Sequence, residues 1–156
     1  MQQIIKSPFK FRLYLIKYLP AAFLSGLKIE SYSDKECTVS VPYKYFTKNP
    51  FRSTYFACLS MAAEMSTGIM AMAGIYSSRQ KVSMLVVALE AKFFKKAIGT
   101  TRFVCEEGME IKQAIEKAIV QNEPQIIKVR SAGFNEANEL VAEFWITWSF
   151  KARKKN

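Results

Sequence analysis

Glu64 has the surroundings best suited to chemistry in this sequence. It is the only charged residue between Arg52 and Arg79, in a run of apolar and small residues. Burial disfavours the charged form of a carboxyl group and should raise its pKa, and a raised carboxyl pKa suits acid–base catalysis near neutral pH. The alternative is a structural carboxylate satisfied by a hydroxyl such as that of Ser60, or by an arginine.

The composition excludes several kinds of active site. The 156 residues contain no histidine, so the chain cannot form a Ser-His-Asp triad, a Cys-His dyad or a zinc site with imidazole ligands. Cys37, Cys58 and Cys105 match neither metal-ligand spacing nor an even set of disulfides. We therefore expect no metal site and three free thiols in a reducing cytoplasm. The six glycines form no phosphate-binding loop of a known pattern.

The charge balance is strongly basic. Twenty-three Lys and Arg against thirteen acids give a net charge of +10, which attracts nucleic acid, anionic lipid or a phosphorylated ligand such as coenzyme A. A solvated basic surface is the plain alternative. The amphipathic N-terminal segment lacks the uninterrupted apolar core of a signal peptide, so a mature cytoplasmic start is expected.

Periodicity predicts one domain spanning 1–156. A short helix over 9–19, closed by Pro20, lies within a lead-in of residues 1–26. Asp34 is placed in the turn of a hairpin. Asn49 as N-cap and Pro50 as first helical residue begin a long central helix, spanning 49–76. The remaining elements are the hairpin strands 27–33 and 35–41, four later strands at 84–96, 100–106, 125–133 and 140–151, a helix at 109–121 and a basic tail at 151–156.

This order indicates an α+β protein in which an antiparallel sheet curls around the long helix, the hotdog fold. The helix is near the length of a membrane span. Seven Ser, Thr or Gly residues and Glu64 make burial in a soluble domain the better interpretation. The last strand supports a core against one face of the sheet, because Phe144, Trp148 and Phe150 alternate with polar residues.

A helical projection separates two faces of the central helix. The bulky face includes Tyr55 and Cys58, for which we expect core positions. The opposite stripe is narrow enough to admit another backbone, another subunit or a ligand. Its members are Ser53, Ala57, Ser60, Glu64, Thr67, Gly68 and Ala71.

The segment KNPFRSTYFACLSMAAEMSTG resembles the phenylacetyl-CoA thioesterase-like branch of the hotdog-fold thioesterases. That branch carries an asparagine, a His-Gly-Gly beginning six residues later and an acid nine residues after the histidine. Asn49 and Glu64 match the asparagine and the acid. Tyr55 stands at the histidine position, and Phe56 and Ala57 stand at the glycine positions. The chain looks most like a hotdog subgroup of unknown function that lacks the His-Gly-Gly loop.

The resemblance implies a homodimer or tetramer with active sites between subunits. The implied substrate is a thioester of coenzyme A or a carrier protein, with coenzyme A as part of the substrate and not a cofactor. On this scaffold Glu64 would be a general base or a nucleophile. Asn49 would orient water or the carbonyl, or act only as a helix cap.

Further residues are candidates for binding the substrate. Backbone N–H groups near Phe56 and Ala57 would polarise the carbonyl, and Tyr55 could replace the missing histidine. Ser60 and Thr67 share the stripe of Glu64. The candidates for the coenzyme A phosphates are Arg52, Lys92, Lys95, Lys96 and Arg102.

Three functions follow from these observations. The first is thioester hydrolysis, or the chemistry of a dehydratase-like relative, with Glu64 as the essential group. The second is a non-catalytic module that binds acyl-CoA or lipid and has lost the chemistry. The third, nucleic-acid binding by an aromatic sheet, is disfavoured because Phe144, Trp148 and Phe150 share the apolar face while only Trp145 lies on the mixed face.

Overall fold

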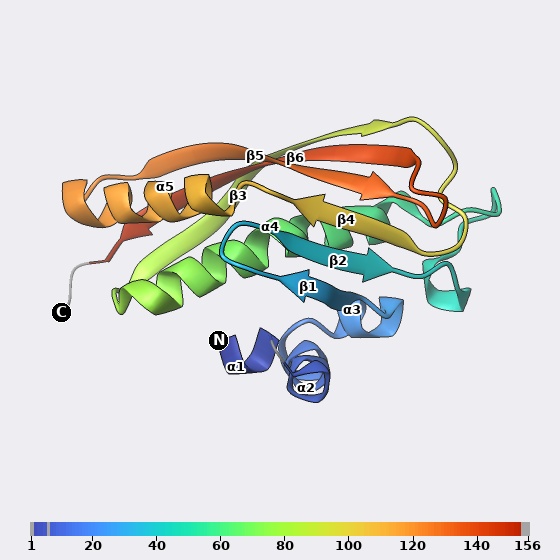
Figure 1. Ribbon diagram of the computed structural model, residues 1–156, viewed down its shortest axis with the longest axis horizontal. Helices are drawn as coiled ribbons and strands as arrows, with labels where there is room; N and C mark the ends of the chain where they lie inside the picture. The colour runs from blue at the N-terminus through green and yellow to red at the C-terminus, as the bar shows by residue number, and fades with distance from the viewer. Residues whose placement is uncertain (1, 6, 154–156) are drawn as a thin grey trace.

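The computed structural model describes residues 2–5 and 7–153, so residues 154–156 of the predicted basic tail lie outside the described chain. Figure 1 shows a sheet that curves around one long helix, with the N-terminal helices below them. The elements in chain order are α1 (Gln2–Ile5), α2 (Pro8–Tyr18), α3 (Pro20–Ser25), β1 (Lys28–Tyr32), β2 (Cys37–Val41), the 3-10 helix η1 (Tyr45–Thr47), α4 (Phe56–Ser78), β3 (Val82–Phe93), β4 (Thr101–Cys105), α5 (Gly108–Gln121), β5 (Gln125–Phe134) and β6 (Leu140–Ala152).

The six strands form one antiparallel sheet in the order β1-β2-β4-β5-β6-β3. The predicted hairpin is confirmed, since β1 pairs with β2 on either side of Asp34. The predicted core face of β6 is also confirmed, because Phe144, Trp148 and Phe150 are buried against the helix side. A sheet wrapped around α4 is the hotdog fold expected from the sequence.

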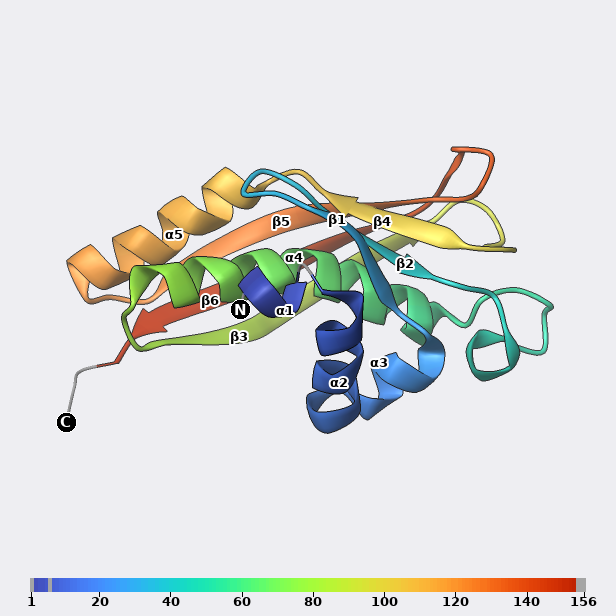
Figure 2. The same ribbon diagram turned by 60° about the horizontal axis from the view of Figure 1, so that its bottom comes forward.

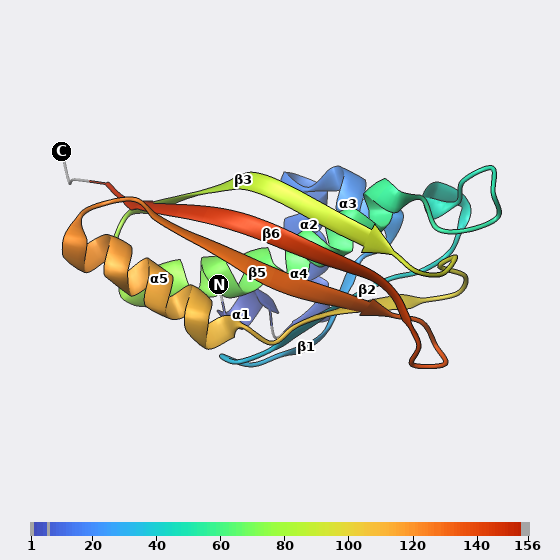
Figure 3. The ribbon, with the colours of Figure 1, turned by 90° about the horizontal axis from the view of Figure 1, so that it is seen from above.

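Strand β3 is the long edge strand of the sheet (Figure 3). A bulge between Val86 and Ala88 shifts its register against β6, and beyond the bulge Leu89 and Phe93 lie opposite the core residues Ile146 and Ala142. Both side chains are nevertheless exposed. The inner face of this edge strand is therefore only partly covered by the rest of the chain.

Helix α4 is the core of the domain, but it begins later than the sequence predicts. The sequence places its start at Asn49 and Pro50, whereas the helix begins at Phe56. Residues 49–55 form a loop in which Arg52 has a φ of 57°, a left-handed conformation that no α-helix continues through. The helix is long and apolar enough to cross a membrane, yet 67% of its most apolar window is buried inside the domain.

The N-terminal segment forms three helices where the sequence predicts one. Ser7 accepts a hydrogen bond from the Lys10 N–H at 3.4 Å and precedes Pro8, so α2 begins with a side-chain cap and a proline. Pro20 ends α2, as predicted, and also begins α3. Figures 1 and 2 show α2 crossing α4 on the side away from the sheet. The Tyr14 hydroxyl donates to the Met72 sulfur there, at 3.6 Å.

Helix α5 confirms the predicted connection over 109–121 to within one residue. Its buried stripe contains Ile111, Ile115 and Ala118, and its contacts are with α4, β5 and β6. It covers the sheet near the C-terminal half of α4 (Figure 3).

Candidate active site

Glu64 lies in the third turn of α4 with its carboxylate over Gly68. A Cβ at Gly68 would be 3.0 Å from Glu64 Oε1 and 3.4 Å from the Trp148 ring. The absence of that Cβ leaves room for the carboxylate beside the indole. Trp148 is fixed by donation from its Nε1 to Thr67 Oγ1, at 2.9 Å, and Thr67 Oγ1 donates to the Glu64 carbonyl at 2.9 Å. The position of the carboxylate is therefore set by α4 and β6 together.

Burial raises the pKa of Glu64, as the sequence predicts. Three ion pairs occur among the described residues, on Glu90, Glu139 and Glu143, and none of them involves Glu64. Ser60, the predicted hydroxyl partner, donates instead to the Phe56 carbonyl at 3.0 Å. In the part of the chain that the structure describes, the desolvation of Glu64 has no compensating cation or hydrogen bond.

One narrow face of α4 remains partly open. Between residues 57 and 71, the side chains that are not fully buried are Ala57, Ser60, Met61 and Glu64. Their spacing of three, four and seven residues places them on one side of the helix. The predicted small-residue stripe is therefore open only in its N-terminal half, and Thr67 is completely buried. Thr67 positions Trp148 and has no surface for a substrate.

A groove of about 620 Å³ lies between the loop before α4 and the end of β3. Its volume is in the range of about 300–1,000 Å³ that small-molecule sites occupy. Phe51, Phe56 and Phe93 contribute to its apolar walls, and Lys95 and Lys96 also line it. This arrangement suits a ligand with an apolar part and an anionic part.

Asn49 lines the groove and also closes the loop that forms one wall. Its Oδ1 accepts hydrogen bonds from the backbone N–H groups of Phe51 and Ser53, at 2.9 and 3.2 Å. Its Nδ2 donates to Ser53 Oγ at 3.1 Å and to the Thr54 carbonyl at 3.4 Å. The predicted role as cap of α4 is wrong, because the Asn49 side chain is used inside the loop.

The N-terminus of α4 adjoins the groove without a side-chain cap. Tyr55 is the N-cap residue, and its carbonyl accepts hydrogen bonds from the N–H groups of Cys58 and Leu59. Within the described residues, the N–H groups of Phe56 and Ala57 have no hydrogen-bond acceptor. The positive end of a 23-residue helix dipole is therefore available to a polarised carbonyl at the positions predicted from the sequence.

Tyr55 is exposed, so its predicted core position is wrong. The projection assumed a helix that begins at Pro50, but Tyr55 precedes the first helical residue and has extended backbone angles. Its ring lies edge-on to that of Phe56, with the centroids 5.0 Å apart. Cys58 is buried as predicted, and burial raises the pKa of its thiol.

The five predicted phosphate-binding cations do not form one cluster. Lys95 and Lys96 line the groove, where Lys95 pairs with Glu139 at 2.6 Å, and Arg52 is exposed in the adjoining loop. Lys92 and Arg102 do not line the groove, because each is next to an inward-facing residue of its strand and so points to the outer face of the sheet. Lys92 Nζ lies 5.4 Å from the Trp145 ring centroid on that face.

Glu64 and the groove are separate within one chain. Glu64 does not line the groove, and it follows Phe56 by eight residues, which corresponds to about 12 Å along the helix axis. The Glu64 carboxylate and the uncapped N–H groups of the same chain therefore cannot contact one small reacting group.

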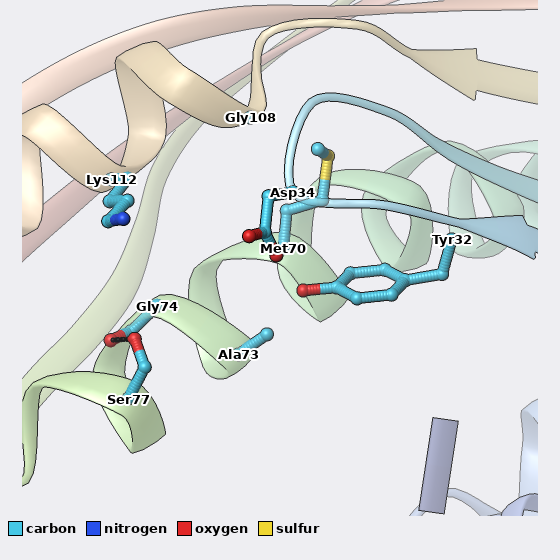
Figure 4. Close-up of a pocket in the computed structure, with 8 residues that line it drawn as sticks. All are labelled: Tyr32, Asp34, Met70, Ala73, Gly74, Ser77, Gly108 and Lys112. Atoms are coloured by element: carbon cyan, nitrogen blue, oxygen red, sulfur yellow. Dashed lines mark hydrogen bonds between the residues drawn. The ribbon is translucent and has the colours of Figure 1, made fainter. Parts of the chain in front are cut away.

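A second cavity lies near the opposite end of α4. Figure 4 shows Tyr32 and Asp34 at the β1–β2 turn, Lys112 on α5, and Gly74 and Ser77 on α4. Its volume of about 100 Å³ is only a few times the roughly 30 Å³ that one water molecule occupies in the liquid. None of the residues predicted to bind or hydrolyse a thioester lines it.

Comparison with known families identifies the chain. The family described as "Domain of unknown function (DUF4442)" matches residues 18–150. The chain belongs to the DUF4442 family. A search of curated proteins finds no match.

Solved structures similar to this DUF4442 chain share its fold at low sequence identity. A protein of unknown function from Chlorobaculum tepidum has 17% identity and a TM-score of 0.79, over 94% of this chain and 98% of that one. A probable thioesterase from Pseudomonas aeruginosa has 19% identity and a TM-score of 0.75, over 94% and 97%. A thioesterase from Haemophilus influenzae has 13% identity and a TM-score of 0.67, over 96% and 94%.

Several groove residues of the DUF4442 chain were not among the predicted site residues. Phe93 and Phe94 form part of the wall opposite the helix. The sequence did contain a signal that could have indicated them. At the end of the predicted strand, two aromatic residues stand directly before Lys95 and Lys96. Gly68 was placed on the stripe, but its role beside Glu64 depends on the position of Trp148, which belongs to a distant part of the sequence.

The stability of this DUF4442 protein should depend on the ionisation of Glu64. Because its folded-state pKa is raised, the folded protein holds this proton at a pH where the unfolded chain has released it. The wild type should therefore lose stability relative to Glu64→Gln as pH rises above 4.5, the ordinary pKa of a glutamate side chain. This loss should end once the pH exceeds the pKa of Glu64 in the folded protein. Each tenfold difference in proton affinity corresponds to about 1.4 kcal/mol.

Urea unfolding of both proteins between pH 4 and 8 measures this difference. Glu116→Gln, at an exposed position of α5, is the matched control and should track the wild type. A constant difference between wild type and Glu64→Gln across this range would contradict a raised pKa.

Replacement of Asn49 should destabilise the loop before α4. Asn49→Ala removes the side-chain hydrogen bonds to the loop, and we expect a loss of about 1–3 kcal/mol in the free energy of unfolding. Asn49→Asp keeps the acceptor oxygens for Phe51 and Ser53 and should lose less than half as much. Urea unfolding compares the two variants, and an Asn49→Ala protein as stable as the wild type would show that the loop does not depend on this side chain.

Proposed function

We propose that this DUF4442 protein is a thioesterase that hydrolyses an acyl thioester of coenzyme A or of a carrier protein. The observation that carries the proposal is Glu64, a largely buried carboxylate with a raised pKa and no partner among the described residues, on the open face of α4. Burial of an unpaired carboxylate destabilises the folded protein, whereas a raised carboxyl pKa is useful for acid–base catalysis, so such groups are often found at active sites. The thioesterase names of two structural neighbours agree with this choice.

The proposed site requires two chains. Edge strand β3 is 12 residues long, and its inner face bears the exposed side chains Leu89 and Phe93, a surface suited to pairing with a second copy. Antiparallel pairing of two β3 strands creates a two-fold axis normal to the sheet, and the two α4 helices then run antiparallel on the same side.

This symmetry can bring Glu64 of one protomer to the first turn of α4 in the other. The condition is that the axis passes near Ser60, which is midway between Phe56 and Glu64. Ser60 is small and lies on the open face of α4, so two helices can approach each other there. A homodimer would thus remove the separation of about 12 Å that exists within one chain.

The proposed reaction is addition of water to the thioester carbonyl. The N–H groups of Phe56 and Ala57 stabilise the developing oxyanion, and Glu64 accepts a proton from the attacking water. The tetrahedral intermediate collapses by breaking the carbon–sulfur bond, and the proton passes from Glu64 to the departing thiolate. The products are a carboxylic acid and a thiol. Direct attack by Glu64, forming an anhydride that water then hydrolyses, is the nucleophilic version.

The groove suggests how the substrate is held. Its apolar walls, with Phe51, Phe93 and Phe94, suit the acyl group or the uncharged part of the pantetheine arm. Lys95 and Lys96 provide positive charge for phosphate groups. Thr54, which also lines the groove, has a buried hydroxyl without a hydrogen-bond partner among the described residues, so a donor or acceptor of the ligand would satisfy it.

Mixed protomers test both the activity and the shared site. Glu64→Gln removes the base, and Phe56→Pro removes one N–H donor. If each site uses groups from both chains, a dimer of one Glu64→Gln chain and one Phe56→Pro chain contains one intact site and one doubly defective site. Random mixing of two inactive variants should then restore about a quarter of wild-type activity, measured as thiol release from a panel of aryl and fatty acyl-CoAs.

The outcomes are distinguishable. No turnover of any thioester by the wild type overturns the proposed activity. If the wild type hydrolyses a thioester but mixing the two variants restores no activity, the shared site is overturned and the proposed activity is not. Binding of acyl-CoA without hydrolysis would support the second candidate, a non-catalytic acyl-CoA or lipid-binding module, which is favoured by the bulky Phe56 ring beside the helix N-terminus.

A further inference from the structure

Helix α2 has two apolar faces. Phe11 and Leu15 are buried against the domain, as expected for a helix that packs on one side. Phe9, Leu13 and Ile16 are 72%, 51% and 50% exposed. At 100° per residue these three side chains fall within about 60° of one another, on the side of the helix opposite Phe11. This exposed stripe, called here the outer stripe of α2, is continuous over two turns.

Cations border the outer stripe on both sides. By the same projection, Lys10 and Lys17 follow one border and Arg12 follows the other, and all three are exposed. The sequence contains no Asp or Glu before Glu30. An apolar stripe flanked by Lys and Arg, with no acid nearby, is the pattern of a helix that lies in the interface of a membrane.

The outer stripe is placed where a flat surface can reach it. Helix α2 lies on the side of α4 away from the sheet and forms the lower edge of the molecule in Figure 1. Figure 2 shows the same helix in front when that edge is turned toward the viewer. No other described element lies beyond it, so docking there needs no rearrangement of the fold.

We propose that the outer stripe of α2 docks on a membrane surface that carries anionic headgroups. Phe9, Leu13 and Ile16 enter the boundary between headgroups and acyl chains. Lys10, Arg12 and Lys17 extend along the stripe and place their charges among the headgroups. A second copy of the same face is a poor occupant, because cations would meet cations with no acid to separate them.

The two parts of the contact make different contributions. Each cation near an anionic surface strengthens partitioning by about fivefold and is sensitive to salt within a Debye length. The apolar side chains contribute by leaving water, and this part does not depend on headgroup charge. Binding should therefore require both an anionic membrane and an intact outer stripe.

Vesicle sedimentation of the full chain tests the proposal. Two kinds of vesicle serve as probes. One contains phosphatidylcholine alone, and the other also contains roughly 30% phosphatidylglycerol, an anionic lipid that gives the surface a negative potential. We expect binding to the anionic vesicles only, weakening at least tenfold when salt rises from about 0.05 to 0.5 M. The variant Phe9→Ser/Leu13→Ser/Ile16→Ser should bind at least tenfold more weakly, as should Lys10→Glu/Lys17→Glu.

Two controls separate docking from nonspecific effects. Val120→Ser/Ile126→Ser changes apolar side chains that are 84% and 68% exposed outside α2 and should bind like the wild type. Thermal unfolding of every variant checks that the fold is kept, and Leu13→Gln alone is the milder substitution if the triple variant unfolds.

Three results would overturn the proposal. The first is the absence of wild-type sedimentation with anionic vesicles. The second is binding that folded outer-stripe variants retain in full. The third is a shift of oligomeric state in the triple variant without vesicle binding by the wild type, which would assign the stripe to a protein contact.

Discussion

Glu64→Gln is expected to lower kcat for thioester hydrolysis by about 10²–10⁴-fold, the usual contribution of a general base. The substitution keeps the size and the hydrogen-bonding shape of the side chain and removes its ability to accept a proton at neutral pH. Since Glu64 is largely buried and unpaired among the described residues, the amide should also fold at least as stably as the acid. Loss of activity would then not be a consequence of unfolding.

The pH dependence separates a base from a residue that only shapes the site. The carboxylate is the active form, so wild-type kcat should rise with pH through the raised pKa of Glu64 and then level off. Glu116→Gln, on the exposed face of α5, should leave both the rate and the profile unchanged. A Glu64→Gln enzyme with wild-type kcat and the same pH profile would remove this carboxylate from the mechanism.

The sheet could be predicted from the sequence because its strands obey a two-residue period. Phe144, Trp148 and Phe150 alternate with polar residues in β6, and burial on one side of the sheet enforces that alternation. The same rule shows which way the candidate phosphate-binding cations on the strands point. Ala91 faces the core, opposite Phe144, so its neighbour Lys92 faces outward and does not line the groove.

The start of α4 could not be read from local signals. Asn49 followed by Pro50 is a strong pattern for a helix N-terminus, but Asn49 binds the loop backbone and Arg52 takes a left-handed conformation. Asparagine serves both purposes, because its short side chain can accept bonds from either a helix or a turn. The choice depends on Thr54, whose N–H donates to the Ala97 carbonyl across the chain at 2.8 Å.

The importance of Glu64 was accessible from the sequence, whereas the geometry of the site was not. A single acid among apolar residues predicts desolvation wherever the helix packs. The groove depends on two segments about forty residues apart, and its separation from Glu64 appears only when the helix start is known. The proposed second protomer is indicated by an edge strand with exposed apolar side chains.

Phe56→Pro should abolish most activity, while Phe56→Ala should not. Both variants remove the aromatic ring, but only proline removes the backbone N–H that is proposed to stabilise the oxyanion. The position tolerates proline, because it is the first helical residue and Tyr55 before it has φ −62° and ψ 132°, the extended conformation that proline requires of its neighbour. The Phe56 N–H has no acceptor in the described chain, so no structural hydrogen bond is lost.

The comparison between these two variants isolates one donor. Removal of an oxyanion-hole donor typically costs about 10²–10³ in kcat, so Phe56→Pro should have a kcat lower than that of Phe56→Ala by this factor, with free energies of unfolding within about 1 kcal/mol. Steady-state hydrolysis of one acyl-CoA and urea unfolding measure both quantities. Equal kcat values for the two variants would move the oxyanion site away from the N-terminus of α4. The ring contributes separately, because Phe56→Ala changes the wall of the groove and is expected to alter KM for the acyl group more than kcat.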